Sequence, residues 1–510
     1  MRRALLAFFC LLLAACSGTR DPLPADTLVR LGAGEIRSLD PALFTDATSA
    51  QIAYDQFEGL TRYNGKGEVV GALAQSWTTS SDGLVWTFRL RDGLTFSDGA
   101  PIRANLFPQL FTRVRDAENP SPHALLYTAV DRIEAPDAGT VRVVLAQPFP
   151  ELPALFAHPS MAAVPMHIID RKGEGWTAER PLVVSGPYRL KSWTLNKELR
   201  LESNPRWHGG SPRIANIVWR PSGDSLSGMR TFLAGEADIA ADFPENRRSW
   251  LEKRYPGVAH VFPIFGTYYV TMNVRKPPFD NVDVRTALAM AVERRWIVKM
   301  LDSGNPPAWG MVPPGLSGLR DWRPAWAEWP RARRLAEARR LLARAGYGPQ
   351  RPLNFEFRFN SSAQHRRVAA ALATMWRDLG VEARMLNSEA GLHFDAMQRG
   401  DFQIARAGWL ADLPAPENFL AIHRADAGPG NYSGYDSARY MTLLDAAMDE
   451  ADPAARARKM RRAEVQLMTD MPVIPIMFYG TRALVGPRVG GWHDNIADMH
   501  PSVDLWLKGK

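Results

Sequence analysis

A short segment near residue 410 places opposite charges where one face of a strand would present both. Arg406, Gly408, Leu410 and Asp412 are separated by steps of two, and alternate residues of a strand point to the same side. The Cα atoms of Arg406 and Asp412 would then lie about 20 Å apart. Subtracting about 6 Å of arginine side chain and about 3 Å of aspartate leaves roughly 10 Å, which three extended residues span.

This spacing fits a zwitterionic tripeptide lying antiparallel to the strand. Its ammonium would approach Asp412 and its carboxylate would approach Arg406. Pairing between the two backbones would add affinity without selecting a peptide sequence. Taken alone, Asp412 before Leu413 and Pro414 is more typical of a turn, so the surrounding sequence has to decide between the two interpretations.

A second segment has the residues of a hydrolase nucleophile. Gly223-Asp224-Ser225-Leu226-Ser227 resembles the nucleophile block of GDSL-type esterases, but none of the ten histidines has an aspartate three residues before it to complete the usual catalytic pair. The simpler interpretation is a helix N-terminus capped by a serine. A hydrolase that uses Ser225 is therefore the alternative of a different class.

Metal and cofactor motifs are absent from the sequence. There is no His-Glu-x-x-His zinc motif, no glycine-rich phosphate loop and no paired cysteine site. His208, His260 and His423 are isolated in the sequence, which is typical of surface or core histidines. We expect no catalytic residues, no metal and no cofactor.

The basic residues do not indicate a nucleic-acid partner. The chain has 62 Lys+Arg against 54 Asp+Glu, a net charge of +8, and most of the basic residues are scattered. The densest group is Arg331, Arg333, Arg334, Arg339 and Arg340. These alternate with leucines and alanines at helical spacing, which predicts the solvated face of a helix.

The N-terminus has the pattern of an export signal with a lipid attachment site. Arg2 and Arg3 precede an apolar run to Ala15 that is shorter than the roughly 20 residues of a membrane-spanning helix. Leu13-Ala14-Ala15-Cys16 resembles the lipobox of bacterial lipoproteins. We predict a signal peptide at 1–15 and a lipidated Cys16 with a polar tether at 16–26. The alternative is a plain signal peptide with an incidental cysteine.

This N-terminal prediction also accounts for the cysteines and for the location. The only other cysteine is Cys10, so the mature chain would have no disulfide and no free thiol to oxidise outside the cytoplasm. We expect a membrane-anchored protein on the periplasmic side. Ser17, rather than aspartate, follows Cys16, which removes the common signal for retention in the inner membrane and leaves the leaflet open.

Periodicity in the rest of the chain indicates alternating strands and helices. Val85–Leu90 and Leu353–Phe359 alternate apolar and polar residues, as half-buried strands do. Apolar residues recur at helical spacing in 284–301, in 335–345 before Gly346, and in 368–379 before Gly380. A length of 510 residues predicts about three domains, and the mixture predicts α/β lobes.

Several longer phrases, in order along the chain, resemble the peptide- and nickel-binding components of ABC importers (family 5 solute-binding proteins), in particular periplasmic oligopeptide-binding proteins. The likeness covers Leu28 to Trp506. The phrases are Phe57–Thr61, Ala74–Trp77, Phe88–Asp98, Ser185–Tyr188, Gly235–Ile239, Tyr268–Arg285 and Ala405–Phe419. Each is weak alone, and their common order makes the resemblance specific.

The resemblance implies an α/β, two-lobed fold of the periplasmic-binding-protein kind with an extra inserted domain, three domains in all. Domain I is discontinuous, domain II is the insertion, and domain III is the opposing lobe. The predicted boundaries are 27–57, 181–268 and 479–510 for domain I, 58–180 for domain II and 269–478 for domain III. Ligand would be enclosed as the lobes close.

The resemblance also assigns ligand-binding roles. Asp412 would hold the peptide amino group, Arg406 and His365 would bind ligand carboxylates, and Trp409 would form the wall of a side-chain pocket. The segments expected to pair with the ligand backbone are Gly408 to Leu410 and, from domain I, Thr45, Asp46 and Ala47. One departure is that the family's disulfide positions correspond to Gly266 and Leu410, so both of its cysteines are missing.

Together these features predict a receptor that captures short peptides and delivers them to an ABC permease and its ATPase subunits. We expect a monomer that is not an enzyme, attached to the membrane through Cys16, with no nucleic-acid partner. One alternative keeps the fold and changes the solute to another amine-bearing ligand, such as a cell-wall peptide, an opine or a nickel chelate. The other alternative is the hydrolase that uses Ser225.

Overall fold

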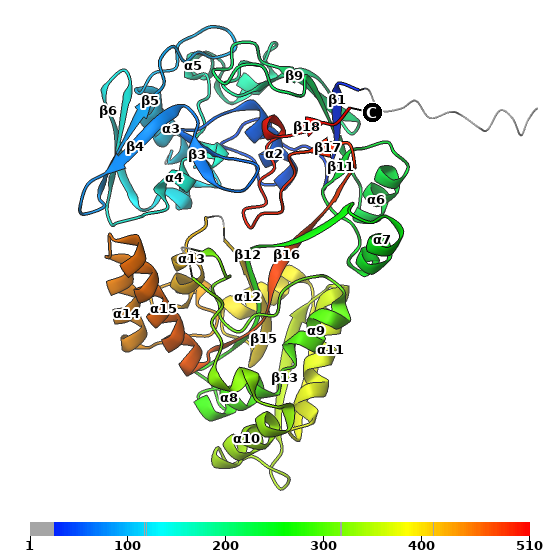
Figure 1. The fold of residues 1–510 in the computed structure, drawn as a ribbon. Coiled ribbons are helices and arrows are strands. Elements are labelled where there is room, and N and C mark those ends of the chain that lie inside the picture. Colours follow the sequence, from blue (N-terminus) through cyan, green and yellow to red (C-terminus); the bar gives the residue numbers. More distant parts are fainter. Residues whose placement is uncertain (1–24, 117, 119, 317–318, 412, 510) are drawn as a thin grey trace, which may run out of the picture.

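The chain folds into two lobes joined by two long strands. The computed structural model describes residues 25–116, 118, 120–316, 319–411 and 413–509. The predicted signal peptide, Cys16 and Asp412 lie outside these residues. Figure 1 shows an upper lobe built from both ends of the sequence and a lower lobe built from its middle, with β12 (Ala259–Met272) and β16 (Val473–Val485) passing between them.

One ten-stranded sheet runs through both lobes. Its order is β14-β13-β15-β12-β16-β11-β1-β10-β9-β8. The bounds of the other eight strands are β14 (Val381–Ser388), β13 (Leu353–Asn360), β15 (Ile404–Leu410), β11 (Ile239–Ala240), β1 (Thr27–Gly32), β10 (Asn216–Pro221), β9 (Glu198–Ser203) and β8 (Tyr188–Thr194). β12 and β16 pair with each other antiparallel, and their length places one end of each in either lobe.

The lower lobe is held by one hydrophobic cluster, whose members lie between Tyr268 and Met477. Strand β13 buries its odd residues, and Trp376 of the following helix packs edge-on against Phe355 and Phe357. That helix therefore covers the apolar face of the strand. The lower-lobe helices are α8 (Val282–Ala291), α9 (Arg294–Leu301), α10 (Arg331–Arg344), α11 (Ala363–Arg377), α12 (Ala390–Gln398), α13 (Glu417–Leu420), α14 (Ala438–Met448) and α15 (Pro453–Asp470).

The upper lobe contains a second sheet of four strands, in the order β4-β5-β7-β6. These are β4 (Ala74–Thr79), β5 (Val85–Leu90), β7 (Thr140–Leu145) and β6 (Val130–Asp137). Phe88 and Val141 from this sheet and Leu199 and Ile217 from the large sheet belong to one hydrophobic cluster. The upper-lobe helices are α2 (Ala47–Gln56), α3 (Leu106–Val114), α4 (Leu152–Leu155), α5 (Met166–Lys172), α6 (Ser225–Leu233) and α7 (Arg248–Arg254).

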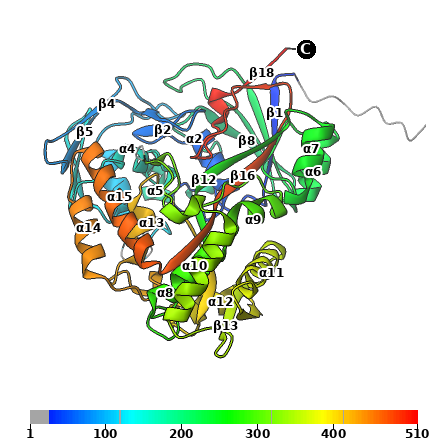
Figure 2. The same cartoon turned by 60° about the horizontal axis from the view of Figure 1, so that its bottom comes forward.

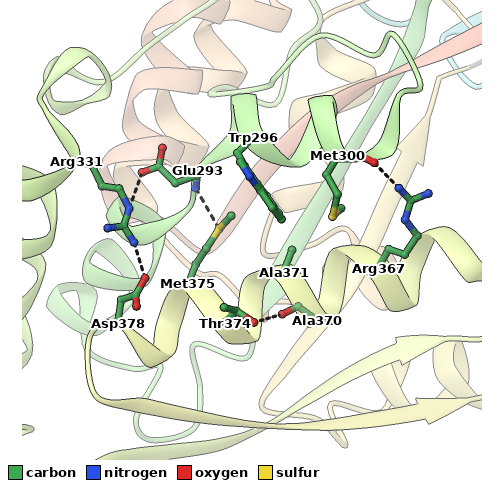
Figure 3. A pocket seen from close by; sticks show the side chains of 10 residues that line it. All are labelled: Glu293, Trp296, Met300, Arg331, Arg367, Ala370, Ala371, Thr374, Met375 and Asp378. Carbon is green, nitrogen blue, oxygen red and sulfur yellow. Dashed lines mark hydrogen bonds and ion pairs between the residues drawn. The ribbon is translucent and has the colours of Figure 1, made fainter. Parts of the chain in front are cut away.

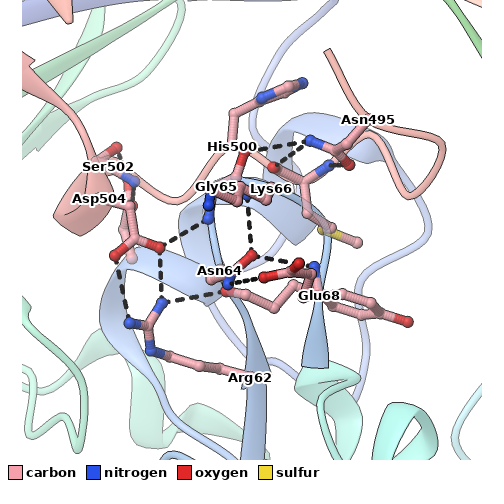
Figure 4. Close-up of polar contacts among 12 residues, drawn as sticks. Arg62, Asn64, Gly65, Lys66, Glu68, Asn495, His500, Ser502 and Asp504 are labelled. Carbon is pink, nitrogen blue, oxygen red and sulfur yellow. Dashed lines mark hydrogen bonds and ion pairs between the residues drawn. The ribbon is translucent and has the colours of Figure 1, made fainter. Parts of the chain in front are cut away.

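The C-terminal segment fastens a hairpin to the upper lobe (Figure 4). The hairpin is formed by β2 (Thr61–Tyr63) and β3 (Val69–Gly71). Asp504 forms an ion pair of 2.8 Å with Arg62 and accepts a hydrogen bond of 2.9 Å from the backbone N–H of Gly65. The last strands, β17 (Val489–Gly490) and β18 (Trp506–Leu507), pair nearby. The last part of the chain is thus an integral part of the upper lobe.

Polar contacts bridge the two lobes beside the crossing strands. The side-chain amide of Gln364 in α11 donates to the Glu245 carboxylate over 2.9 Å, and the Ser249 hydroxyl donates to Asp302 over 2.8 Å. Each contact joins an upper-lobe residue to a lower-lobe residue. They are few, and they lie at the ends of helices rather than along their packed faces.

A smaller apolar contact joins the lobes on the side of the second sheet. Leu413 and Ala415, which follow β15, are buried in the upper-lobe cluster. A Cβ atom added to Gly83 would lie 3.3 Å from the Cβ of Ala451, in the turn between α14 and α15. Figure 2 shows these two helices beside β4 and β5. The lobes therefore already touch at one edge.

The period-based predictions agree closely with the elements. Val85–Leu90 is β5, 353–359 lies within β13, and Gly346 and Gly380 follow α10 and α11 with positive φ angles of 85° and 77°. The apolar spacing over 284–301 is interrupted, because the chain leaves helical geometry at Val292 and forms α8 and α9 separately.

Two local predictions were wrong. Arg334 is buried rather than solvated, because its guanidinium bonds to the Glu293 carboxylate and to the Met290 carbonyl. The cap of α6 is Asp224, whose carboxylate accepts a hydrogen bond of 2.8 Å from the Ser227 N–H, rather than a serine. In both cases a carboxylate makes the interaction that the pattern had left out.

Candidate functional site

Strand β15 has one edge that is only partly covered. β12 pairs with all of its residues from Ile404 to Leu410. On the other side, β13 pairs only with Ile404 and Ala405. Among the described residues, no strand borders β15 from Arg406 onward on that side. An exposed strand edge of this kind can accept a further extended chain.

The direction of the β15 backbone groups follows from its pairing with β12. The Ala411 N–H donates to Phe265 and the Asn273 N–H donates to Gln403, over 2.8 and 2.9 Å. Because antiparallel pairs alternate, odd-numbered residues of β15 bond to β12 and even-numbered residues face the other edge. Gly408 and Leu410 therefore present their N–H and C=O groups at the uncovered edge.

Arg406 lies at the inner end of this edge and is only 7% exposed. Its guanidinium donates to the Asn360 side-chain oxygen over 3.3 Å and to the Tyr479 hydroxyl, and it stacks 4.8 Å from the ring centroid of Tyr268. Its Nε has no partner, and no described carboxylate lies within ion-pair distance of it. A buried cation without an anion is costly, so this group is suited to receive one.

His365 adds to the same region. It lies in the first turn of α11, after the cap Ser362, and its ring centroid is 5.5 Å from that of Tyr268. Burial, and then the positive charge of Arg406, lowers the pKa of His365 to about 3, so the imidazole is neutral. The N-terminus of α11 contributes further partial positive charge. Arg406 and His365, predicted from the sequence to act together, are thus brought into one site.

The remaining β15 residues have distinct surroundings. Trp409 is half-buried and packs against the lower-lobe cluster. A Cβ atom at Gly408 would lie 2.4 Å from the Tyr479 hydroxyl, so a glycine is needed for the approach of the tyrosine that orients Arg406. Leu410 is 59% exposed and lies directly opposite Gly266 in the ladder. The two positions that the resemblance assigned to a disulfide are therefore neighbours.

The predicted contacts from the upper lobe lie at the N-terminus of α2. Asp46 caps this helix by accepting a hydrogen bond of 2.8 Å from the Ser49 N–H. Thr45 and Ala47, on either side of it, are exposed. These residues are in the opposite lobe from β15 (Figure 1). Asp412, predicted for the ligand amino group, lies outside the described residues.

The sequence interpretation missed the residues that orient Arg406. Tyr268, Asn360 and Tyr479 come from β12, β13 and β16, which are far apart in the chain and meet only in the sheet. His393 of α12 was also missed. Its imidazole bonds to the Arg406 carbonyl over 2.8 Å. No spacing rule connects these positions, and a sheet order would have been needed to find them.

Ser225 lies in a different setting. It is the first residue of α6 and lines a small depression with Ser222, Asp224 and Asp242. No histidine is among the residues lining this depression. Among the described residues, no three His, Cys, Asp or Glu side chains are close enough to hold a metal ion. Within the same part of the chain, no helix combines the length and hydropathy needed to cross a bilayer.

A separate groove of about 520 Å³ lies between α9 and α11 (Figure 3). Trp296, Met300 and Met375 point into it. At its rim Arg331 forms ion pairs with Glu293 and Asp378. None of the predicted site residues lines this groove, so the groove and the β15 edge are distinct features of the lower lobe.

Two lobes joined by a pair of long strands, with an open strand edge and a buried cation between them, define a periplasmic-binding-protein-like solute receptor with an inserted domain. The sequence matches the family described as bacterial extracellular solute-binding proteins, family 5 middle, over residues 68–431. The chain belongs to this family.

Individual relatives agree with this assignment. The periplasmic oligopeptide-binding protein OppA of Salmonella typhimurium is 33% identical, covering 94% of this chain and 93% of its own. The unliganded open form of the murein tripeptide-binding protein MppA superposes with a TM-score of 0.87 at 30% identity, over 95% of this chain and 98% of that one. OppA of Haemophilus influenzae in complex with the peptide RPPGFSPFR gives 0.75 at 27% identity, over 96% and 100%.

Proposed function

We propose that this protein is the extracytoplasmic receptor of an ABC importer and that it binds short peptides between its two lobes. The uncovered edge of β15, beside a buried arginine without an anion, is the observation that carries the proposal. Membership of a solute-binding family and its similarity to oligopeptide-binding proteins support it. The protein itself would perform no chemistry.

In this proposal the peptide is an added strand antiparallel to β15. Gly408 and Leu410 pair with its backbone, which gives affinity with little dependence on side chains. Arg406 and His365 bind its carboxylate, and Asp412 binds its ammonium. Trp409 borders a side-chain position.

The opposing lobe would complete the enclosure. Thr45, Asp46 and Ala47 at the start of α2 would close over the peptide from above. The predicted division into domains I, II and III remains a part of the proposal. Because β12 and β16 are the strands that connect the lobes, closure would bend them while both clusters keep their packing.

The location follows from the N-terminal sequence. Lipid on Cys16 would hold the receptor at the membrane, and the tether at 16–26 would let it reach the permease. Leu13-Ala14-Ala15-Cys16 is the support for this anchor. Replacement of Cys16 by alanine should then move the protein from the detergent phase to the aqueous phase of a phase-separation assay.

A cell-wall peptide is the second candidate ligand. The TM-score of 0.87 to a murein tripeptide-binding protein favours it, and such a ligand keeps the free amino group that Asp412 would bind. It requires no change in the proposed site, because it also presents carboxylates toward Arg406 and His365.

A thermal-shift screen with mixed tri- to pentapeptides, a murein tripeptide, a sugar and a nickel chelate tests the proposal. A ligand that binds only the folded state adds about 2.7 kcal/mol of stability at 100 times its Kd, so binding peptides should raise the melting temperature clearly. Stabilisation by the sugar or chelate with no response to any peptide would refute peptide binding. An ester-hydrolysis assay with a Ser225→Ala control tests the hydrolase alternative.

A further inference from the structure

His393 occupies a backbone group that the open edge of β15 would otherwise offer to a ligand. Arg406 is even-numbered, so its carbonyl faces the uncovered edge together with the groups of Gly408 and Leu410. The His393 ring nitrogen Nε2 lies 2.8 Å from this carbonyl oxygen. Because a carbonyl only accepts, Nε2–H is the donor. The first backbone acceptor of the edge is therefore already used.

This contact is permanent under ordinary conditions. His393 is 0% exposed, and burial, followed by the charges of Arg406 and Arg358, lowers its pKa to about 4 although the hydrogen bond opposes this. The imidazole is neutral at pH 5 to 8 and keeps one proton. With Nε2–H bonded to Arg406, its Nδ1 is the unprotonated nitrogen, and Nδ1 has no described partner.

Strand β13 covers what lies beyond. Arg358 pairs with Ala405 and Phe357 pairs with Ile404, so an added strand cannot continue past Arg406. The edge that remains consists of Gly408 and Leu410. Two such positions are about 7 Å apart, and about three ligand residues cover them with their flanking peptide groups.

We propose that His393 sets the inner end of the peptide-binding edge and thereby selects ligands of about three residues over longer ones. This rests on the proposed function, since it presupposes a peptide paired with β15. A longer peptide would have to leave the strand at Gly408, because the next carbonyl is occupied. His393 is then a positioning residue that acts through the Arg406 backbone and has no ligand contact of its own.

The test is calorimetric binding of related tri- and pentapeptides to wild type and to His393→Phe. Phenylalanine keeps an aromatic ring but cannot donate, so the Arg406 carbonyl becomes available to a longer ligand. One additional hydrogen bond is worth roughly a tenfold change in affinity, and the preference for the tripeptide should fall by about that factor. His423→Phe, at another buried histidine of the lower lobe that packs near Tyr269, should leave the preference unchanged.

A second measurement works on wild type alone, should His393→Phe fail to fold. Each amide of a pentapeptide is replaced in turn by an ester, which removes one N–H. Esters should weaken binding only where the N–H faces Gly408 or Leu410. A loss at the N–H facing Arg406, or an unchanged length preference in His393→Phe, overturns the proposal while peptide binding stands. If wild type binds no peptide of any length, it is the proposed function that fails.

Discussion

The two junctions of this molecule are built differently. Within the upper lobe, residues of both sheets, such as Phe88 and Leu199, belong to one continuous hydrophobic cluster. Between the lobes there are two strands, a few hydrogen bonds such as Gln364 to Glu245, and the small contact made by Leu413 and Ala415. Close-packed apolar surfaces resist displacement, whereas strands can bend. The inserted sheet should move with its lobe, and the lobes should move against each other.

The crossing strands have features that suit bending. The β12–β16 register shifts between Pro263 and Thr267, which is a bulge or irregularity in the ladder. Gly266 lies within this interval, and Gly480 lies beside it on β16. Bulges bend a strand locally and interrupt its pairing. The position of this irregularity between the lobes contrasts with the regular pairing of β15 with β12 inside the lower lobe.

The largest expected effect comes from breaking the shared core. Phe88→Ala removes a fully buried ring and should lower the free energy of unfolding by about 3–5 kcal/mol. Hydrogen exchange should accelerate together in β4–β7 and in β8–β10. Leu125→Ala, at an exposed leucine, should change stability by no more than about 0.5 kcal/mol. Acceleration confined to β4–β7 would show that the two sheets are separate units.

The next effect concerns binding at the open junction. Arg406→Gln should weaken peptides with a free C-terminus by about 30- to several-thousand-fold, as expected for one member of an enclosed charge pair. C-terminal amidation should then cause little additional loss. Arg366→Gln, an exposed arginine on α11, is the control. Full and independent losses from both changes in calorimetry would argue against a carboxylate at Arg406.

The same logic applies to the amino end. Asp412→Asn keeps the shape of the side chain and removes its charge, and should cost about 2–5 kcal/mol of binding free energy. N-acetylation of the peptide should weaken wild type by a similar order and the variant much less. Additive losses would exclude a pair between Asp412 and the peptide ammonium.

A pH effect should be specific to the lower lobe. Glu464 is buried, and burial raises its pKa to about 7, despite the opposing charge of Arg461. The native state then holds a proton that the unfolded state releases, so stability falls as pH rises from about 4.5 to 7, by on the order of 3 kcal/mol. Glu464→Gln should flatten this slope in urea unfolding at several pH values, and an equal slope in both proteins would contradict it.

The smallest effect is expected at the lobe contact. Gln364→Ala removes one hydrogen bond to Glu245 and should change the free energy of unfolding by about 1 kcal/mol or less. Small-angle scattering would report any wider opening of the lobes. Gln398→Ala on exposed α12 surface is the matched control. A loss above about 3 kcal/mol would mean that this junction is as firmly packed as the upper-lobe core.

Sequence patterns predicted the local elements better than the surroundings of the site. β5 and β13 were recoverable because alternation directly reflects one buried face. Arg406 and His365 were recoverable from a resemblance and from parity. Tyr479 and His393 were not, because their relation to Arg406 depends on which strands and helices are neighbours in space. Arg334 was misjudged because an ion pair with Glu293 offsets the cost of burying a charge.

The attachment of Leu413 and Ala415 to the upper-lobe cluster has a mechanical consequence. Arg406 is fixed in the lower lobe, while the chain just beyond β15 is anchored in the other body. The short stretch between them works like a strap across a pair of jaws. When the jaws pivot, the strap must shift at one of its two ends, so the gap that a ligand bridges between Arg406 and this strap becomes a gauge of the angle. A ligand of the wrong span would hold the jaws at the wrong angle, and the permease would sense fit through the angle alone.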